Sequence, residues 1–65
     1  MKELIGANAG IVWEFLNENG NKTIKEIKAA TKLTEKDLYA ALGWLAREEK
    51  IELTKADKDY TVTLL

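Results

Sequence analysis

The fold is decided by the stretch TIKEIKAATKLTEKDLYAALGWLAREEKIEL, residues 23–53, because it contains two helix starts in close succession. At the first, Thr23 is followed three positions later by Glu26, the capping box that satisfies two otherwise unbonded backbone N–H groups. At the second, Thr34 precedes acidic residues, which the helix dipole favours in a first turn. Two capped helices therefore stand about three residues apart.

Apolar spacing gives each of these two helices an inward face. In the first helix, we expect that face to consist of Ile24, Ile27 and Ala30. In the second, the i, i+3, i+4, i+7 pattern of a core stripe is formed by Leu38, Ala41, Leu42 and Leu45.

Another helix precedes this stretch. Its apolar side is formed by Ile5, Ala9, Val12, Phe15 and Leu16. Gly20 is suited to the left-handed conformation that commonly ends a helix. Glycines weaken the first turns, so two starting points are open, one near Lys2 and one at an Asn8 cap.

After the last helix the apolar pattern changes to the alternation of half-buried strands. Ile51 and Leu53 alternate with polar residues, and so do Tyr60, Val62 and Leu64, with the short polar segment KADKD between them. This pattern predicts a two-stranded hairpin. Helix, short helix, helix and hairpin together predict an α+β fold in one domain over residues 1–65. That fold is a winged helix-turn-helix with the hairpin as its wing, and a short third strand is expected near Lys22–Thr23.

The motifs also carry a family resemblance. The turn LTE followed by the run L-x-x-L-x-x-x-x-x-I resembles the entry into the recognition helix and wing of prokaryotic winged helix-turn-helix regulators. With LIGANAGIVWEFLNENG in front, the whole chain looks most like a family of small stand-alone winged-helix proteins of unknown function from bacteria and archaea. The resemblance implies a reader of duplex DNA that regulates transcription. One departure is Glu49, where such domains usually carry glycine before the wing.

Composition excludes several function classes. The chain has 65 residues without cysteine, histidine or proline, which removes thiol nucleophiles, zinc-finger spacings and the commonest general base. Its carboxylate pairs lie at a helix end and in a turn, where solvent keeps them ordinary acids. We therefore expect no enzyme, no cofactor and no metal. The absence of cysteine is typical of a cytoplasmic protein, and no apolar run is long enough for a membrane span.

Charge is unevenly distributed along the chain. The net charge is −1, from ten basic and eleven acidic residues. Residues 22–36 carry five lysines against two glutamates, or +3, whereas residues 1–21 and 37–65 carry −2 each. A basic segment inside an acidic chain indicates a localised anion-binding surface rather than general attraction to nucleic acid.

On the DNA-binding hypothesis, the nucleic-acid contacts come from three elements. The first capped helix crosses the phosphate backbone and supplies Thr23, Lys25, Lys28 and Lys32. The recognition helix presents Lys36, Ala40, Gly43 and Arg47 opposite its core stripe. The wing tip adds Lys55 and Lys58.

Each of these features also has an alternative interpretation. Gly43 costs about 1 kcal/mol in a helix, and such a position indicates close approach either of nucleic acid or of a protein element, within the domain or across a homodimer. The lysine face is equally consistent with an ordinary solvated surface. Trp13 and Trp44 cover the edge of the core, or Trp44 anchors a protein partner. The second hypothesis is therefore a protein-interaction module that uses Ala40, Gly43 and Trp44. Acidic residues in the recognition helix argue against DNA.

Overall fold

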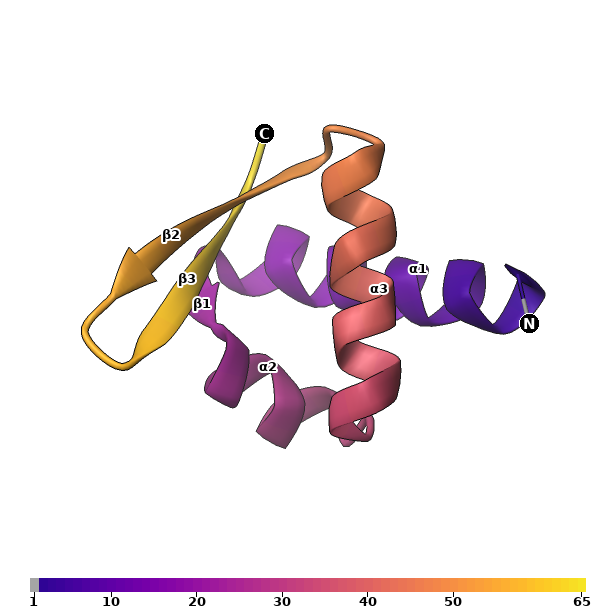
Figure 1. Ribbon diagram of the computed structural model, residues 1–65, viewed down its shortest axis with the longest axis horizontal. Helices are drawn as coiled ribbons and strands as arrows, with labels where there is room; N and C mark the ends of the chain where they lie inside the picture. Colours follow the sequence, from indigo (N-terminus) through magenta and orange to yellow (C-terminus); the bar gives the residue numbers. More distant parts are fainter. Residues whose placement is uncertain (1) are drawn as a thin grey trace.

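The expected order of three helices and a hairpin is confirmed by the structure, a computed structural model that describes residues 2–65, with side chains from residue 3 onward (Figure 1). In Figure 1, α3 crosses in front of α1, and the hairpin extends to the side that also holds α2. The elements are α1 (Lys2–Asn19), β1 (Lys22–Thr23), α2 (Ile24–Thr31), α3 (Glu35–Arg47), β2 (Ile51–Ala56) and β3 (Asp59–Leu64).

The sheet has three antiparallel strands in the order β1-β3-β2. Val62 in the central strand β3 pairs with Leu53 on one side and with Lys22 on the other. The short strand expected near Lys22–Thr23 is therefore confirmed. It ties the start of α2 to the wing, because Thr23 is both the last residue of β1 and the N-cap of α2.

The first helix takes the earlier of its two possible starting points. It begins at Lys2, and Asn8 is a buried residue within the helix rather than its cap. At its end, Gly20 adopts φ 81° and donates its N–H to the Leu16 carbonyl at 2.8 Å. The left-handed cap expected at this glycine is confirmed.

The caps of α2 and α3 are also confirmed. The N–H of Thr23 donates to Glu26 Oε1 at 2.9 Å, and the N–H of Glu26 donates back to Thr23 Oγ1 at 3.2 Å. Thr34 Oγ1 accepts the N–H of Asp37 at 3.2 Å. Side-chain caps therefore start both helices, and the turn between them runs from the C-cap Lys32 to the N-cap Thr34.

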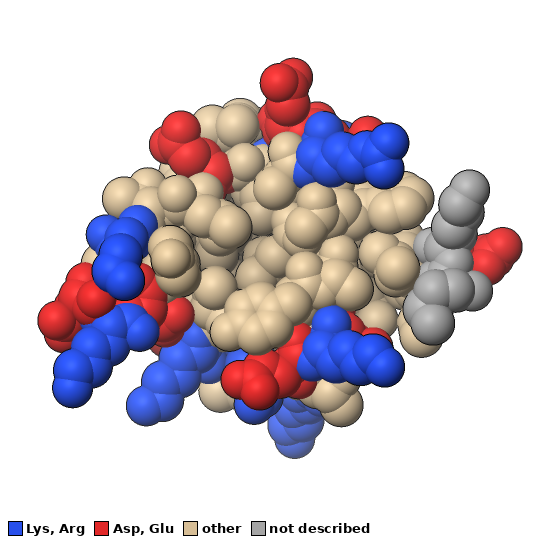
Figure 2. Space-filling model, viewed as in Figure 1, with Lys and Arg blue, Asp and Glu red and all other residues tan. Residues whose placement is uncertain are grey.

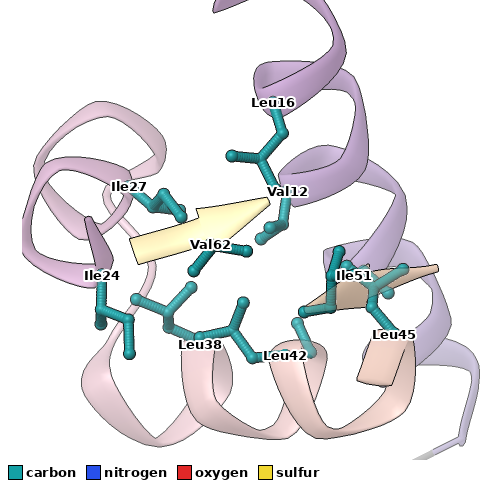
Figure 3. Close-up of a cluster of buried hydrophobic side chains, with 11 residues drawn as sticks. Val12, Leu16, Ile24, Ile27, Leu38, Leu42, Leu45, Ile51 and Val62 are labelled. Atoms are coloured by element: carbon teal, nitrogen blue, oxygen red, sulfur yellow. The ribbon is translucent and has the colours of Figure 1, made fainter. Parts of the chain in front are cut away.

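The core lies where all three helices meet the sheet (Figure 3). Val62 of β3 lies between Ile27 of α2 and Val12 of α1, and Leu38 and Leu42 of α3 close the cluster on the opposite side. All five of these side chains are almost completely buried. Burial of such aliphatic side chains contributes about 1.5–3 kcal/mol each, and it is the main force that holds the small sheet against the helices.

One expected core position is wrong: Ala30 is exposed. In α2 the inward positions are Ile24, Ile27 and Thr31, and the Thr31 hydroxyl donates to the Ile27 carbonyl at 2.7 Å. Because Thr31 follows Ile27 by four residues, it takes the next inward place and turns Ala30 to solvent.

The end of α3 has a left-handed residue, a conformation that favours glycine. Glu49 adopts φ 58°, its N–H donates to Ala46, and the N–H of Lys50 donates to Leu45 at 2.9 Å. This pair of hydrogen bonds is the Schellman motif, which places its left-handed residue at the position of Glu49. The fold therefore keeps the expected helix end, with a strained glutamate in place of glycine.

The wing is longer than its polar turn predicts. Its strands continue to Ala56 and Asp59, so only Asp57 and Lys58 form the turn, with Asp57 at φ 56°. On the paired strands, Lys55 Nζ lies 5.7 Å from the centre of the Tyr60 ring, within cation–π range.

Among the helices described, none is long and apolar enough to cross a membrane.

Candidate nucleic-acid interface

The exposed side of α3 is a ridge formed by Lys36, Ala40, Gly43 and Arg47, which we call the outer ridge. Its members recur on the side opposite the buried stripe that begins at Leu38. Ala40 is half-buried and the other three are exposed. The sequence prediction of this ridge as a surface is therefore consistent with the geometry.

Gly43 faces open space. A Cβ built on Gly43 has no heavy atom within 4 Å beyond its own helix and chain neighbours. Close packing within the domain is therefore not the reason for this glycine. Two of the interpretations stay open, namely approach of nucleic acid and approach of another protein.

Along one edge of the outer ridge runs a groove of about 390 Å³, which we call the basic groove. Lys25 and Lys28 of α2 line one wall, Lys58 of the wing turn lines another, and Tyr39 of α3 lines a third. The structure thus brings together three of the lysines that the sequence assigned separately to the helix and to the wing. Glu35 and Asp59 also line the groove, and the net positive charge that remains makes it suited to an anion.

The carboxylate of Asp59 joins two walls of the basic groove. Its Oδ2 accepts the backbone N–H of Lys25 at 3.1 Å, and its Oδ1 accepts the N–H of Tyr60 at 2.7 Å. The hydrogen bonds from Tyr60 and then Lys25 lower the pKa of Asp59 below its usual value. The wing turn is therefore fixed to the first turn of α2 by a carboxylate that stays ionised at neutral pH.

Thr23, which the sequence placed among the nucleic-acid contacts, is half-buried and engaged in capping. Its hydroxyl accepts the N–H of Glu26 and lies 3.1 Å from Glu26 Oε1. The bonds from the backbone and side chain of Thr23 lower the pKa of Glu26. The arrangement gives Thr23 a role in fixing α2 beside the groove.

The remaining cations proposed from the sequence lie outside the basic groove. Lys32 is exposed in the turn between α2 and α3, at φ 59°. Lys36 and Arg47 lie near the two ends of α3, and Lys55 lies against the Tyr60 ring. The candidate interface therefore consists of one concentrated cluster and several separate charges.

The space-filling view shows how these charges are distributed (Figure 2). Uncharged side chains cover the centre of the face that α3 presents, and charged side chains of both signs lie around its rim. Charges of both signs gather at the lower left, over the wing tip and α2. The surface is thus a neutral centre with a mixed but locally basic border.

A second groove, of about 360 Å³, lies along the other edge of α3, and we call it the aromatic groove. Gly6 and Gly10 of α1 leave its floor open, and Trp13 and Trp44 form its sides. The two indoles are 38% and 39% exposed, which agrees with the expectation that they cover the edge of the core. Lys50 is the charged residue among those lining it.

Sequence reasoning missed two contributors to the basic groove, Tyr39 and Asp59. Tyr39 could have been found from the helical spacing, because it lies beside the outer ridge on α3. Asp59 could not, because its contact with Lys25 depends on the pairing of β1 with β3. Gly6, Gly10 and Trp13 on one side of α1 were a readable sign of the aromatic groove.

Within residues 2–65, no group of acidic residues is placed to hold a metal ion.

Comparison with known proteins agrees with the fold. A family model described as a winged helix-turn-helix domain (DUF2582) matches residues 1–64. The uncharacterized protein MJ1608 of Methanocaldococcus jannaschii is 38% identical over 66 residues, covering 92% of this chain and 89% of that protein. The solution NMR structure of protein BT2368 from Bacteroides thetaiotaomicron is similar with a TM-score of 0.86 and 35% identity, covering 97% of this chain and 77% of that chain.

Proposed function

This chain belongs to the DUF2582 family of winged helix-turn-helix domains, and from that membership and the basic groove we propose that it binds duplex DNA. The observation that carries the proposal is the convergence of Lys25, Lys28 and Lys58 on one edge of the outer ridge. In helix-turn-helix proteins the second helix enters the major groove while the first crosses the backbone. Here α3 and α2 take these two places.

The shape of the outer ridge supports this use. Lys36 and Arg47 lie on either side of Ala40 and Gly43, whose small or missing side chains leave the helix backbone accessible. A helix with a small-residue centre can approach base edges or sugars closely, and cations at its ends reach phosphates. The ridge therefore combines close approach with backbone positioning.

The charge of the chain sets the expected strength of binding. With a net charge of −1, non-specific attraction over the whole surface is weak. Binding must come from the few cations at the interface, so it should be strongest at low salt and fall as ionic strength rises. The same proposal includes a role in the regulation of transcription, in the cytoplasm and without catalysis.

The proposal is tested by fluorescence anisotropy with a labelled mixed-sequence duplex of about two helical turns, across a range of salt concentrations. We expect an affinity that falls linearly with salt on a log–log scale, and weaker binding for Lys36→Gln and Arg47→Gln. Lys50→Gln is a matched control, since Lys50 lines the aromatic groove instead. Absence of binding at low salt would overturn the proposal.

A second candidate function is favoured by the aromatic groove. Two half-exposed tryptophans beside an open glycine floor are suited to a large apolar side chain of a protein partner, including a second copy of this chain. Sedimentation velocity of the wild type, Trp44→Ala and Gly10→Leu tests the homodimer, because both positions line the aromatic groove. A dimer that is lost in these variants would support it, whereas a monomer in all three would exclude self-association on this side of α3.

A further inference from the structure

We propose that α2 and the wing turn form one phosphate-binding site, in which Lys25, Lys28 and Lys58 hold a single phosphodiester of the DNA backbone and Asp59 positions the wing lysine. This inference rests on the proposed DNA binding and goes beyond it, because it assigns one ligand group to two elements far apart in the sequence. Asp59 is a positioning residue here.

The site is assembled from two elements that lie far apart in the sequence. Lys58 lies in a two-residue turn at the end of the hairpin, where it is exposed. The next residue, Asp59, is fixed by hydrogen bonds to the backbones of Lys25 and Tyr60. The bond from Lys25 ties the residue after Lys58 to α2, and the bond from Tyr60 orients the same carboxylate within the wing. Lys58 is thereby kept beside α2 as a wall of the basic groove.

The net charge of the groove lining matches that of one phosphate. Three lysines line it together with two acids, Glu35 and Asp59, so its lining carries one net positive charge. A phosphodiester carries one negative charge, and lysine ammonium groups bind phosphate as point charges. The balance therefore fits one backbone phosphate rather than a cluster of anions.

The charge of Asp59 and its positioning role predict opposite changes in DNA affinity when Asp59 is replaced. On electrostatics alone, removal of a negative charge from a phosphate site should strengthen DNA binding. If Asp59 positions Lys58, its replacement should weaken binding instead. Asparagine has the same shape but only one acceptor oxygen, so Asp59→Asn must lose one of the two hydrogen bonds.

The chain offers a matched control in the same turn. Asp57 is exposed and adopts φ 56°, a conformation that asparagine tolerates well. Asp57→Asn removes the same charge close to Lys58 without touching the bonds of Asp59. The two variants therefore separate the charge of a carboxylate from its positioning role.

The experiment measures the affinity of the full chain for the same duplex across salt concentrations, with amide NMR spectra confirming that each variant is folded. We expect Lys25→Gln, Lys28→Gln and Lys58→Gln each to weaken binding roughly threefold to tenfold, and the removal of all three lysines to reduce the salt slope by about one, because the site neutralises one phosphate. The double variant Lys25→Gln/Lys58→Gln should lose less than the product of the single effects, since both serve one phosphate. Asp59→Asn should weaken binding, and Asp57→Asn should leave it unchanged or stronger.

Three outcomes decide between the alternatives. Tighter binding by Asp59→Asn, equal to that of Asp57→Asn, would overturn the positioning role. Wild-type binding that responds to Lys36→Gln but not to Lys25→Gln, Lys28→Gln or Lys58→Gln would overturn the phosphate site while leaving DNA binding intact. No binding by the wild type would overturn the proposed function itself, and the phosphate site with it.

Discussion

The backbone N–H of Lys25 donates a hydrogen bond to the Asp59 carboxylate, 34 positions further along the chain, at 3.1 Å. This contact joins the helix-turn-helix to the wing at the wall of the basic groove. The tip of the hairpin lies outside the hydrophobic core, so apolar packing cannot position it. A polar contact performs that task, and it makes the geometry of the candidate interface sensitive to one carboxylate.

Acid should destabilise the folded chain through Asp59 and Glu26. Hydrogen bonds from backbone N–H groups lower the pKa of both carboxyls in the folded state. Their contribution to stability is therefore complete above the unfolded pKa of about 4 and is lost as pH falls through the lowered folded values. Urea unfolding between pH 7 and pH 2 should show this loss, and it should be smaller in Glu26→Gln and Asp59→Asn. An equal loss in the wild type and both variants would contradict the assignment.

Glu49→Gly should stabilise the protein. A non-glycine residue at φ 58° is strained by about 1–2 kcal/mol, whereas glycine adds an unfolding entropy of about 0.5–1 kcal/mol, so the net gain is about 0.5–1 kcal/mol. Glu48→Gly is the control, because Glu48 has φ −82° and should only lose stability. Thermal unfolding followed by circular dichroism measures both. A lower melting temperature for Glu49→Gly would refute the strain at this helix end.

Gly43→Ala should separate stability from binding. Alanine is favoured over glycine by about 1 kcal/mol in a helix interior, and its methyl group meets open space here, so the variant should be more stable. If DNA approaches the outer ridge closely, the same methyl group should weaken binding. Gly10→Ala in α1 is the matched control, since its Cβ also meets open space but lies in the aromatic groove. It should gain stability with unchanged DNA affinity, and an equal effect of both variants on binding would exclude close approach at Gly43.

Leu38→Ala and Ala30→Ser should differ sharply in their cost. Leu38 is completely buried, so its truncation should lower the free energy of unfolding by about 2–5 kcal/mol. Ala30 is exposed, and a change there should stay within about 0.5 kcal/mol. Denaturant titration distinguishes the two, and a large loss for Ala30→Ser would restore that residue to the inward face of α2.

Local signals predicted the architecture of this fold correctly. Thr23 and Thr34 start helices through contacts within three residues, and the alternation from Ile51 onward predicted the strands. The alternation was wrong about burial at Leu53 and Tyr60, which are exposed. The inward face of α2 was harder to predict, because Thr31 takes the inward place four residues after Ile27 and its polar hydroxyl is satisfied by the Ile27 carbonyl. In so short a helix, apolar character alone does not decide which residue faces the core.

The candidate site was predicted in pieces. Lys25, Lys28 and Lys58 were each identified from charge and position, but their convergence depends on the β1–β3 pairing and on Asp59. Such long-range contacts leave no periodic trace in the sequence. The small residues of α1 are visible in the sequence, but only the packing of α1 against α3 places Trp44 opposite them.

The central claim, that α2, α3 and the wing turn form a DNA-binding surface, is tested most directly by a backbone-amide NMR titration with a duplex of about two helical turns, at low and then physiological salt. The account predicts salt-sensitive shifts at residues 23–28, at residues 36–47 and at Lys58. The amides of Gly6 and Gly10 should be unaffected. Absence of shifts at low salt, or shifts confined to the aromatic groove, would contradict the claim.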